Sequence, residues 1–201
     1  MEQYLEEMEQ YARENDIPIM QKEGIQFLQK IIKENQSKNI LEIGSAIGYS
    51  AIQMCRMDKE IHVVTMERDD IRYQEAVKNV QHCQLEGRIT LLHVDALEAE
   101  IEGLYDLIFI DAAKAQYIRF FERYQKNLAP HGMIVSDNLK FHGMVESKEP
   151  IRNRNTRQLV GKIRKYISYL KENASFETIF YDCGDGVAIS RRKECGEMHS
   201  D

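Results

Sequence analysis

The chain has 201 residues, and its 33 acidic against 27 basic side chains give a net charge of −6 at pH 7. This length suits one domain with a full core, and the acidic balance excludes a uniformly basic nucleic-acid coat. The four cysteines lie far apart without C-x-x-C spacing and no apolar run reaches 18 residues, which argues against a disulfide framework, a zinc site and a membrane span.

Apolar runs and segments of helical periodicity alternate along nearly the whole chain. The pattern predicts helices at 2–14, 20–35, 48–57, 69–84, 115–128 and 153–172. It predicts strands at 39–43, 61–67, 89–95, 105–111, 132–138, 176–183 and 186–192, the last two joined by a Gly184-Asp185-Gly186 turn. This alternation indicates an α/β fold, in which a parallel sheet carries helices on both faces and the closing hairpin adds an antiparallel strand.

We expect a single domain over residues 1–201, in which helices at 1–36 precede an α/β core at 37–193 and a disordered tail at 194–201. The acidic, amphipathic start MEQYLEEMEQ is unlike a signal peptide, so we expect a cytoplasmic protein with no membrane partner. Tyr4, Leu5, Met8 and Tyr11 form an apolar stripe on this first helix. Such a stripe usually docks on its own domain, and the alternative is docking on a second copy of the chain.

A glycine turn, EIGSAIGYS, follows the strand at 39–43. It is not the G-x-G-x-x-G pattern, and Glu42 would repel a pyrophosphate. An acid beside a glycine turn suits a ligand that carries positive charge and no phosphate, such as S-adenosylmethionine. The alternative is a solvated acid beside a structural turn.

Two further acids end the next two strands. Glu67 is placed for hydrogen bonds to a ribose diol, as acids are in nucleotide-binding sheets. Asp95 is placed to accept a hydrogen bond from an adenine amino group. Either acid alone could cap a helix, but three acids at successive strand ends favour a nucleoside site.

These residues, together with the motifs DAAKAQY and SDN, resemble the S-adenosylmethionine-dependent O-methyltransferases of the catechol and caffeoyl-CoA type, over residues 15–192. The resemblance implies a Rossmann-like class I methyltransferase fold, with a seven-stranded, mostly parallel sheet whose last strand is antiparallel. It also implies cofactor contacts, which are Met20, Gly44, Ser50, Glu67, Asp95 and Ala96, with Asp111 near the methionine end. Family habit further implies a homodimer.

Polar residues also follow the strands at 105–111 and 132–138. Asp111, Asp137 and Asn138 offer three hard oxygens, which suit Mg²⁺ or another divalent cation such as Mn²⁺ better than zinc. The alternative is two helix caps and an asparagine turn. Lys114 lies three residues after Asp111, and in the resembling family the lysine at this place is taken as the general base. Lys114 and Asp111 are the predicted catalytic pair, one for the proton and the other for the cation.

Seven basic residues against one acid lie between positions 148 and 165. They are Lys148, Arg152, Arg154, Arg157, Lys162, Arg164 and Lys165. Arg154, Arg157 and Arg164 fall away from the apolar stripe of the helix, on a face that could bind phosphates or could simply be solvated. The stretch resembles the bacterial branch of the family that methylates 5-hydroxyuridine at the tRNA wobble position. We therefore predict that Arg152, Arg154 and Arg157 contact a tRNA anticodon loop.

Two other functions remain open from the sequence. A small catechol-like phenol presents the same pair of adjacent oxygens as 5-hydroxyuridine, so the metal site does not distinguish the two substrates. A nucleoside-binding module without catalysis would leave Lys114 and the Asp137-Asn138 pair idle.

Overall fold

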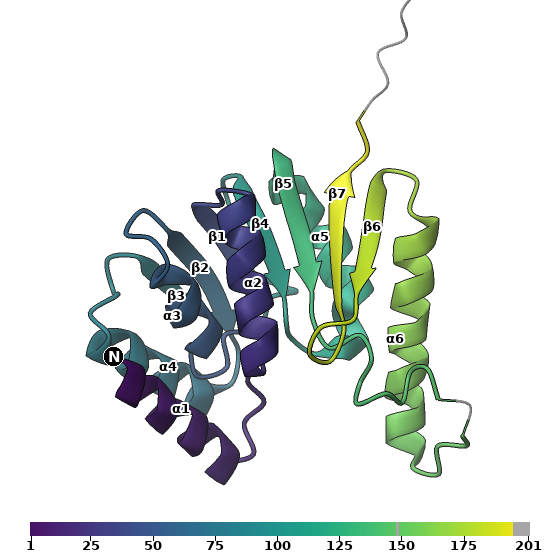
Figure 1. Cartoon of the computed structure of the whole chain (residues 1–201), viewed down its shortest axis with the longest axis horizontal. Helices are drawn as coiled ribbons and strands as arrows, with labels where there is room; N and C mark the ends of the chain where they lie inside the picture. Colours follow the sequence, from purple (N-terminus) through teal and green to yellow (C-terminus); the bar gives the residue numbers. More distant parts are fainter. Residues whose placement is uncertain (148, 195–201) are drawn as a thin grey trace, which may run out of the picture.

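The computed structural model describes residues 1–147 and 149–194 (Figure 1). Lys148 lies outside the described residues, and so does the tail predicted to be disordered, from residue 195 onward. Within the described residues, no helix combines the length and the apolar character needed to cross a membrane.

Every predicted element is present, with ends shifted by a few residues. The helices are α1 (Glu2–Glu14), α2 (Lys22–Glu34), α3 (Tyr49–Cys55), α4 (Asp70–His82), α5 (Tyr117–Tyr124) and α6 (Arg154–Glu172). The strands are β1 (Asn39–Ile43), β2 (His62–Glu67), β3 (Ile89–His93), β4 (Tyr105–Ile110), β5 (Leu128–Ser136), β6 (Phe176–Tyr181) and β7 (Val187–Arg192). The helix predicted at 115–128 divides into α5 and two flanking 3₁₀ turns, η1 (Lys114–Gln116) and η2 (Gln125–Asn127).

The seven strands form one sheet in the order β3-β2-β1-β4-β5-β7-β6. Strands β1 to β5 pair in parallel, whereas β7 runs antiparallel to both of its neighbours. The predicted fold class, with an antiparallel last strand, is therefore confirmed. The carboxyl ends of β1 to β5 meet at one edge of the sheet, where ligands of such folds bind.

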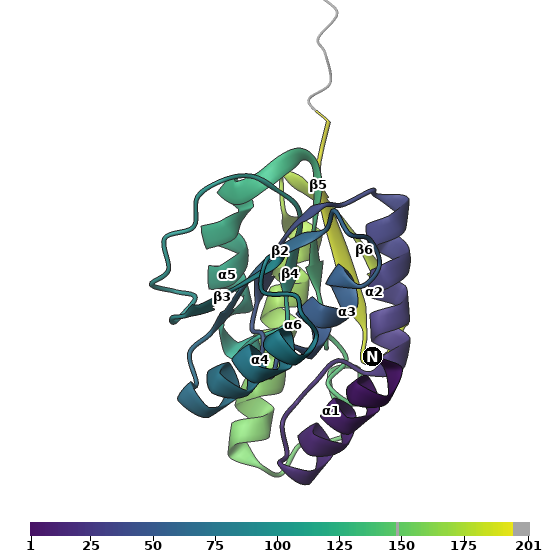
Figure 2. The ribbon, with the colours of Figure 1, turned by 90° about the vertical axis from the view of Figure 1, so that its left-hand side faces the viewer.

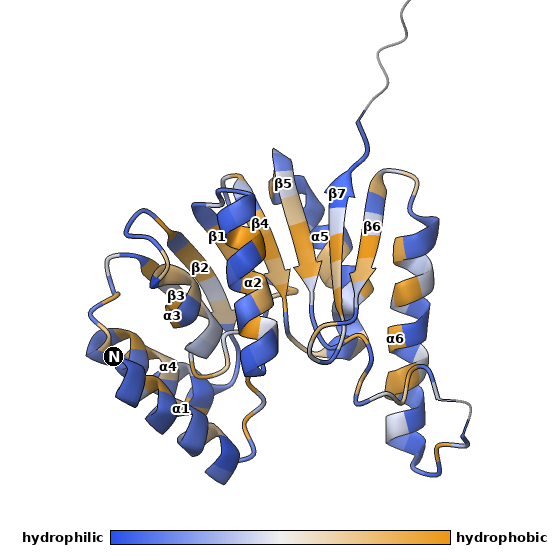
Figure 3. Ribbon diagram, in the orientation of Figure 1, coloured by the Kyte–Doolittle hydropathy of each residue, from blue (hydrophilic) through white to orange (hydrophobic). Residues whose placement is uncertain are grey.

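Helices cover both faces of the sheet, as the view along the sheet shows (Figure 2). Ile40 and Phe109 pack toward α1 to α3, and Leu41 and Ile108 pack toward α5 and α6. This alternation follows from the two-residue period of a strand. The strands are accordingly apolar along most of their length, and polar residues gather on the outer sides of the helices (Figure 3).

Helix α1 docks on its own domain. Leu5, Met8 and Ala12 are buried beneath it, and the Tyr4 hydroxyl donates a hydrogen bond of 2.7 Å to Asn79 Oδ1 on α4. The apolar stripe of the first helix is thus used within the chain.

Candidate active site

A cavity of about 350 Å³ opens at the carboxyl ends of β1, β2, β3 and β4. Six of the residues predicted for the site line it, namely Gly44, Glu67, Asp95, Ala96, Asp111 and Lys114. They come from the carboxyl ends of four strands and the connections that follow them, which the parallel sheet brings to the same edge. The cavity has the size and the polar groups of a small-molecule site.

Gly44 is required by the close packing of the first loop. Its φ is +99°, and a Cβ at this position would lie 2.5 Å from the backbone oxygen of Asp111. The loop is held over β2 by hydrogen bonds from the Gly44 and Ser45 backbone N–H groups to the Met66 carbonyl. The Ser45 hydroxyl in the same loop is buried and has no hydrogen-bond partner among the described residues. The packing against Asp111 accounts for the glycine, and Ser45 does not line the cavity.

Glu67 is oriented by three backbone groups. Its Oε2 accepts a hydrogen bond of 2.9 Å from Ala46 N–H, and its Oε1 accepts hydrogen bonds of 2.9 Å from Arg68 and Asp69. A carboxylate has about four acceptor positions, so one remains on Oε2 for a ligand hydroxyl. This arrangement fits the predicted contact with a ribose.

Asp95 both caps a turn and lines the cavity. Its Oδ1 accepts a hydrogen bond of 2.8 Å from Leu97 N–H, and its Oδ2 lies 3.2 Å from Arg68 Nη1. The Leu97 hydrogen bond, and then the Arg68 charge, lower the pKa of Asp95. The carboxylate is therefore an ionised acceptor at neutral pH, as a contact to an adenine amino group requires.

The predicted metal ligands and Lys114 converge at the ends of β4 and β5. The backbone N–H groups of Asp111 and Asp137 bind Ile43 O and Ile110 O on the adjacent strands, and Lys114 Nζ donates a hydrogen bond of 2.7 Å to Asn138 Oδ1. Asp137 is buried. Asp111 and Lys114 line the same cavity, so the aspartate and the lysine do face one mouth.

The electrostatics of this group fit a divalent cation. Burial raises the pKa of Asp111, which Lys114 opposes. Burial and then the charge of Asp111 raise the pKa of Asp137 to about 8. Asp137 is buried and Asp111 is half-buried, and two carboxylates held close together in such a site are costly without a compensating cation. Within 1–147 and 149–194, no three His, Cys, Asp or Glu side chains gather in a metal-binding cluster, and the two aspartates with Asn138 form an all-oxygen set of the kind that Mg²⁺ or Mn²⁺ prefers.

Asp137 and Asn138 lie next to the cavity residues Asp111 and Lys114 but do not line the cavity themselves. Three of the predicted cofactor contacts are also not brought to it. The Glu42 carboxylate is fully buried beneath α3, where it accepts hydrogen bonds from Ser50 and Thr65. Strand alternation is the reason, because Glu42 lies on the same face of β1 as Ile40. Ser50 is occupied by this contact, and Met20 packs in the core with its methyl carbon 2.9 Å from the place of a Cβ on Gly24.

The predicted phosphate contacts lie at the amino end of α6, which projects past the carboxyl ends of the strands (Figure 1). Arg152, Arg154 and Arg157 are exposed, and one nitrogen of Arg157, Nη1, donates a hydrogen bond of 3.1 Å to the Ile151 carbonyl. Helix α6 packs against η1, the turn that begins with Lys114. The expectation that Arg164 is free for phosphates is wrong. Its guanidinium donates hydrogen bonds to the carbonyls of Val145 and Ser147, because the loop before α6 folds back over the helix.

Sequence reasoning missed Arg68, whose charged side chain contacts a predicted ligand-binding acid in the cavity. Arg68 lines the cavity and pairs with Asp95. Its position directly after Glu67, at the end of β2, is the signal that could have revealed it.

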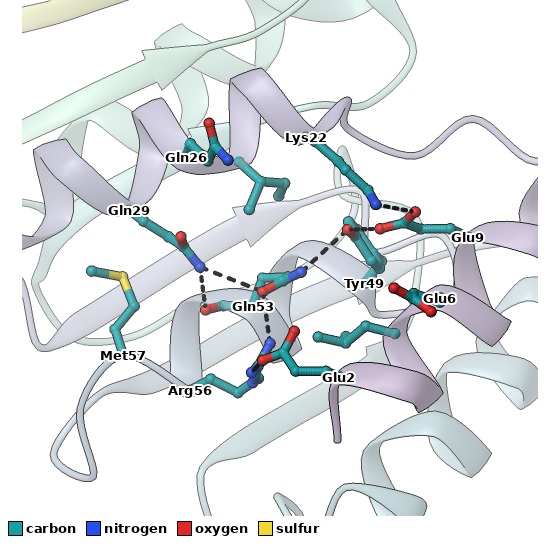
Figure 4. Close-up of a pocket in the computed structure, with 12 residues that line it drawn as sticks. Glu2, Glu6, Glu9, Lys22, Gln26, Gln29, Tyr49, Gln53, Arg56 and Met57 are labelled. Atoms are coloured by element: carbon teal, nitrogen blue, oxygen red, sulfur yellow. Dashed lines mark hydrogen bonds and ion pairs between the residues drawn. The ribbon is translucent and has the colours of Figure 1, made fainter.

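A second cavity, of about 390 Å³, lies between α1, α2 and α3 (Figure 4). Its polar side chains bind one another, since the Tyr49 hydroxyl donates a hydrogen bond of 2.7 Å to Glu9, and Lys22 lies 3.1 Å from the same carboxylate. None of the predicted site residues lines it. Its network ties the two N-terminal helices to α3.

Comparisons with known proteins agree with this geometry. A family model described as O-methyltransferase matches residues 1–193. The catechol O-methyltransferase of Niastella koreensis is 31% identical over 176 residues, which cover 82% of this chain and 77% of that protein. A crystal structure from Staphylococcus aureus, assigned as a caffeoyl-CoA O-methyltransferase, is 37% identical with a TM-score of 0.90, and the match covers 94% of this chain and 92% of that chain. The O-methyltransferase of Bacillus cereus, in complex with S-adenosylhomocysteine (SAH), is 28% identical with a TM-score of 0.75 over 94% of this chain and 90% of that chain.

Proposed function

The chain belongs to the S-adenosylmethionine-dependent O-methyltransferase family, and from this we propose that it methylates the 5-oxygen of 5-hydroxyuridine at the tRNA wobble position, giving 5-methoxyuridine. The observation that carries the proposal is a cavity lined by the nucleoside-binding acids and by the Asp111–Lys114 pair. Helix α6, which begins among exposed arginines, packs against the η1 turn that starts with Lys114.

The residues of the cavity divide the work between the methyl donor and the acceptor. Glu67 and Asp95 would hold the ribose and the adenine of S-adenosylmethionine. Asp111, Asp137 and Asn138 would hold a divalent cation, which when bound lowers the pKa of a hydroxyl group. Lys114 would accept the hydroxyl proton or stabilise the resulting negative charge. Holding donor and acceptor in line can supply roughly 7–11 kcal/mol of the barrier.

The proposed substrate fits both the cation site and the basic helix. The 5-hydroxyl and the 4-carbonyl of 5-hydroxyuridine are adjacent oxygens that would chelate one cation. A base in a single-stranded anticodon loop is splayed from its neighbours at low cost. Arg152, Arg154 and Arg157 would hold phosphates near Lys114, so binding should weaken steeply with salt.

A small catechol-like phenol is the second candidate substrate. The identity to the catechol O-methyltransferase of Niastella koreensis supports it, and a phenol would need no contact from α6. A nucleoside-binding module without catalysis is the third candidate. Methyl transfer to any vicinal diol in the presence of Mg²⁺ would exclude it.

The first test separates the cation site from the cofactor site. We expect chelation to abolish methyl transfer, and Asp137→Ala to lose turnover while it keeps most of the affinity for SAH. Lys114→Ala should lower kcat by about 10²–10⁴-fold and change its pH profile if the lysine is the base. Full activity after exhaustive chelation would contradict the cation site, and an unchanged pH profile would make Lys114 a surface residue.

The second test separates the two substrates. tRNA from a strain that lacks the protein should accumulate an unmethylated 5-hydroxyuridine derivative, which the purified protein should convert to 5-methoxyuridine. Replacing Arg152, Arg154 and Arg157 together with Ala should reduce this activity far more than any activity on a free catechol.

The matched control replaces three exposed basic residues of α1 and α2, which are Arg13, Lys30 and Lys33. This variant should act on tRNA as the wild type does. Two outcomes would favour the small-molecule function. One is an equal loss of activity on tRNA and on catechol in the triple arginine variant, and the other is methylation of catechols but never of hydroxylated tRNA.

A further inference from the structure

Arg68 joins the two acids that we assign to the nucleoside. It directly follows Glu67 at the end of β2, and its backbone N–H donates a hydrogen bond of 2.9 Å to that carboxylate. Its guanidinium reaches the next strand end, where Nη1 lies 3.2 Å from Asp95 Oδ2. The side chain therefore spans the mouth of the cavity from the predicted ribose contact to the predicted adenine contact.

Stability does not account for this ion pair. The Arg68 side chain is 69% exposed and that of Asp95 is 32% exposed, and ion pairs of this kind contribute only about 0–1 kcal/mol. What the pair does provide is orientation. It holds a flat, permanently charged group at the rim of a cavity instead of letting it extend into solvent.

The same end of the cavity is suited to a flat heterocycle. Ala96 and Leu97, which directly follow Asp95, line the cavity, and so does Phe120 of α5. Guanidinium groups stack on the faces of aromatic rings, both through their planarity and through attraction of the cation to the π electrons. A planar base bound beside Asp95 would thus meet apolar groups and a guanidinium.

We propose that Arg68 is a cofactor-binding residue whose guanidinium stacks on the adenine ring of S-adenosylmethionine. The ion pair with Asp95 holds the guanidinium in place for this contact. This inference rests on the use of S-adenosylmethionine in the proposed function, and it does not depend on the RNA substrate. A lysine at this position would keep the charge but lose the plane that stacks.

Calorimetry with SAH tests the proposal without any methylation assay. Arg68→Ala should weaken SAH binding by about five- to twentyfold, in line with a stacked cation in a partly desolvated site. Arg68→Lys should weaken it nearly as much. Arg13→Ala is the matched control, because Arg13 is an exposed arginine of α1 that does not line this cavity, and it should change the affinity by less than about twofold.

A second probe distinguishes stacking from a structural role. S-ribosylhomocysteine keeps the sugar and the amino acid of SAH but lacks the base, so wild type and Arg68→Ala should bind it equally. Unchanged SAH affinity in Arg68→Ala would overturn the proposal, and so would wild-type SAH affinity in Arg68→Lys. An equal loss of affinity for SAH and S-ribosylhomocysteine in Arg68→Ala would also overturn it. Failure of the tRNA assay would leave these binding results unaffected.

Discussion

The carboxyl group of Glu42 lies beneath the glycine loop, where Ser50 and Thr65 donate hydrogen bonds to it. Burial raises its pKa to about 7 despite these two donors, which favour the ionised form. The residue therefore carries a proton in the folded chain at pH values where the unfolded chain has lost it. Its effect on stability must depend on pH.

We expect Glu42→Gln to remove this dependence. Below about pH 4.5 the carboxyl is protonated in both the folded and the unfolded chain, so it makes no pH-dependent contribution to the free energy of unfolding. As the pH rises toward 7, only the unfolded chain releases the proton. The free energy of unfolding therefore falls. The free energy of unfolding of the variant, measured relative to that of the wild type, should therefore increase by about 3 kcal/mol from pH 4.5 to pH 8. Urea unfolding at the two pH values measures the difference.

The exposed acid Glu98 supplies the control for this experiment. Glu98→Gln should shift the free energy of unfolding by similar small amounts at both pH values. A Glu42→Gln variant that followed the wild type across the whole range would mean that Glu42 is ionised in the folded chain.

Gly44 sets a second constraint at the scale of a single residue. Gly44→Ala places a methyl group against the Asp111 carbonyl at a positive φ, so we expect a loss of about 1–3 kcal/mol in stability together with weaker SAH binding. Gly87→Ala is the matched control, since a Cβ there meets nothing within 4 Å. Thermal unfolding and SAH calorimetry measure both effects, and equal results for the two variants would contradict the tight packing of the loop.

At the scale of elements, the β6–β7 hairpin holds the segment that follows β5. Asp185 Oδ1 accepts a hydrogen bond of 2.6 Å from His142 N–H, and the Asp185 and Gly186 carbonyls accept from Lys140 and Leu139. This support matters because Asn138, Phe141 and His142 have φ values of +58°, +46° and +55°. Such left-handed conformations persist only where the surroundings hold them, and Asn138 is a predicted cation ligand.

We expect Asp185→Ala to loosen this segment, lowering stability by about 1 kcal/mol and weakening Mn²⁺ binding measured by electron paramagnetic resonance. Asp185→Asn should keep most of the Mn²⁺ affinity, because its amide oxygen can still accept from His142 N–H. SAH affinity should stay the same in both variants, since Glu67 and Asp95 lie on other connections.

Asp182→Ala is the control within the same hairpin. Asp182 forms an ion pair with Lys140 at the protein surface. Surface ion pairs contribute little to stability, so Mn²⁺ binding should be nearly unchanged. Equal Mn²⁺ affinity in Asp185→Ala and the wild type would show that the hairpin does not position Asn138.

At the scale of the whole molecule, the docking of α1 changes the basis of the predicted homodimer. Leu5 and Met8 are 3% exposed, so the stripe that could have bound a second copy packs on α3 and α4. The dimer now rests on family resemblance alone. We expect light scattering at micromolar concentration to give the mass of two chains, and a mass near 23.5 kDa would contradict it.

Local patterns were enough to predict the elements and the α/β class, whereas the seven-stranded methyltransferase fold was implied by the family resemblance. The bounds of β1 agree with the prediction at both ends, and the other strands agree within a few residues, because two-residue and 3.6-residue periodicities are properties of short segments. Parallel strands place their carboxyl ends at one edge, which is why Glu67, Asp95 and Asp111 could be assigned to a common cavity from their positions at strand ends.

The destination of individual side chains depended on the tertiary structure. Glu42 turns toward α3 instead of the cavity, Arg164 binds the carbonyls of the preceding loop, and Arg68 meets Asp95 across two strand ends. In each case the partner is 8 or more residues away in the sequence, and a hydrogen bond or ion pair is decided by where that partner lies in space. Residue type and strand position predict which groups reach an edge of the sheet, whereas only the packed neighbours decide which of them remain available to a ligand.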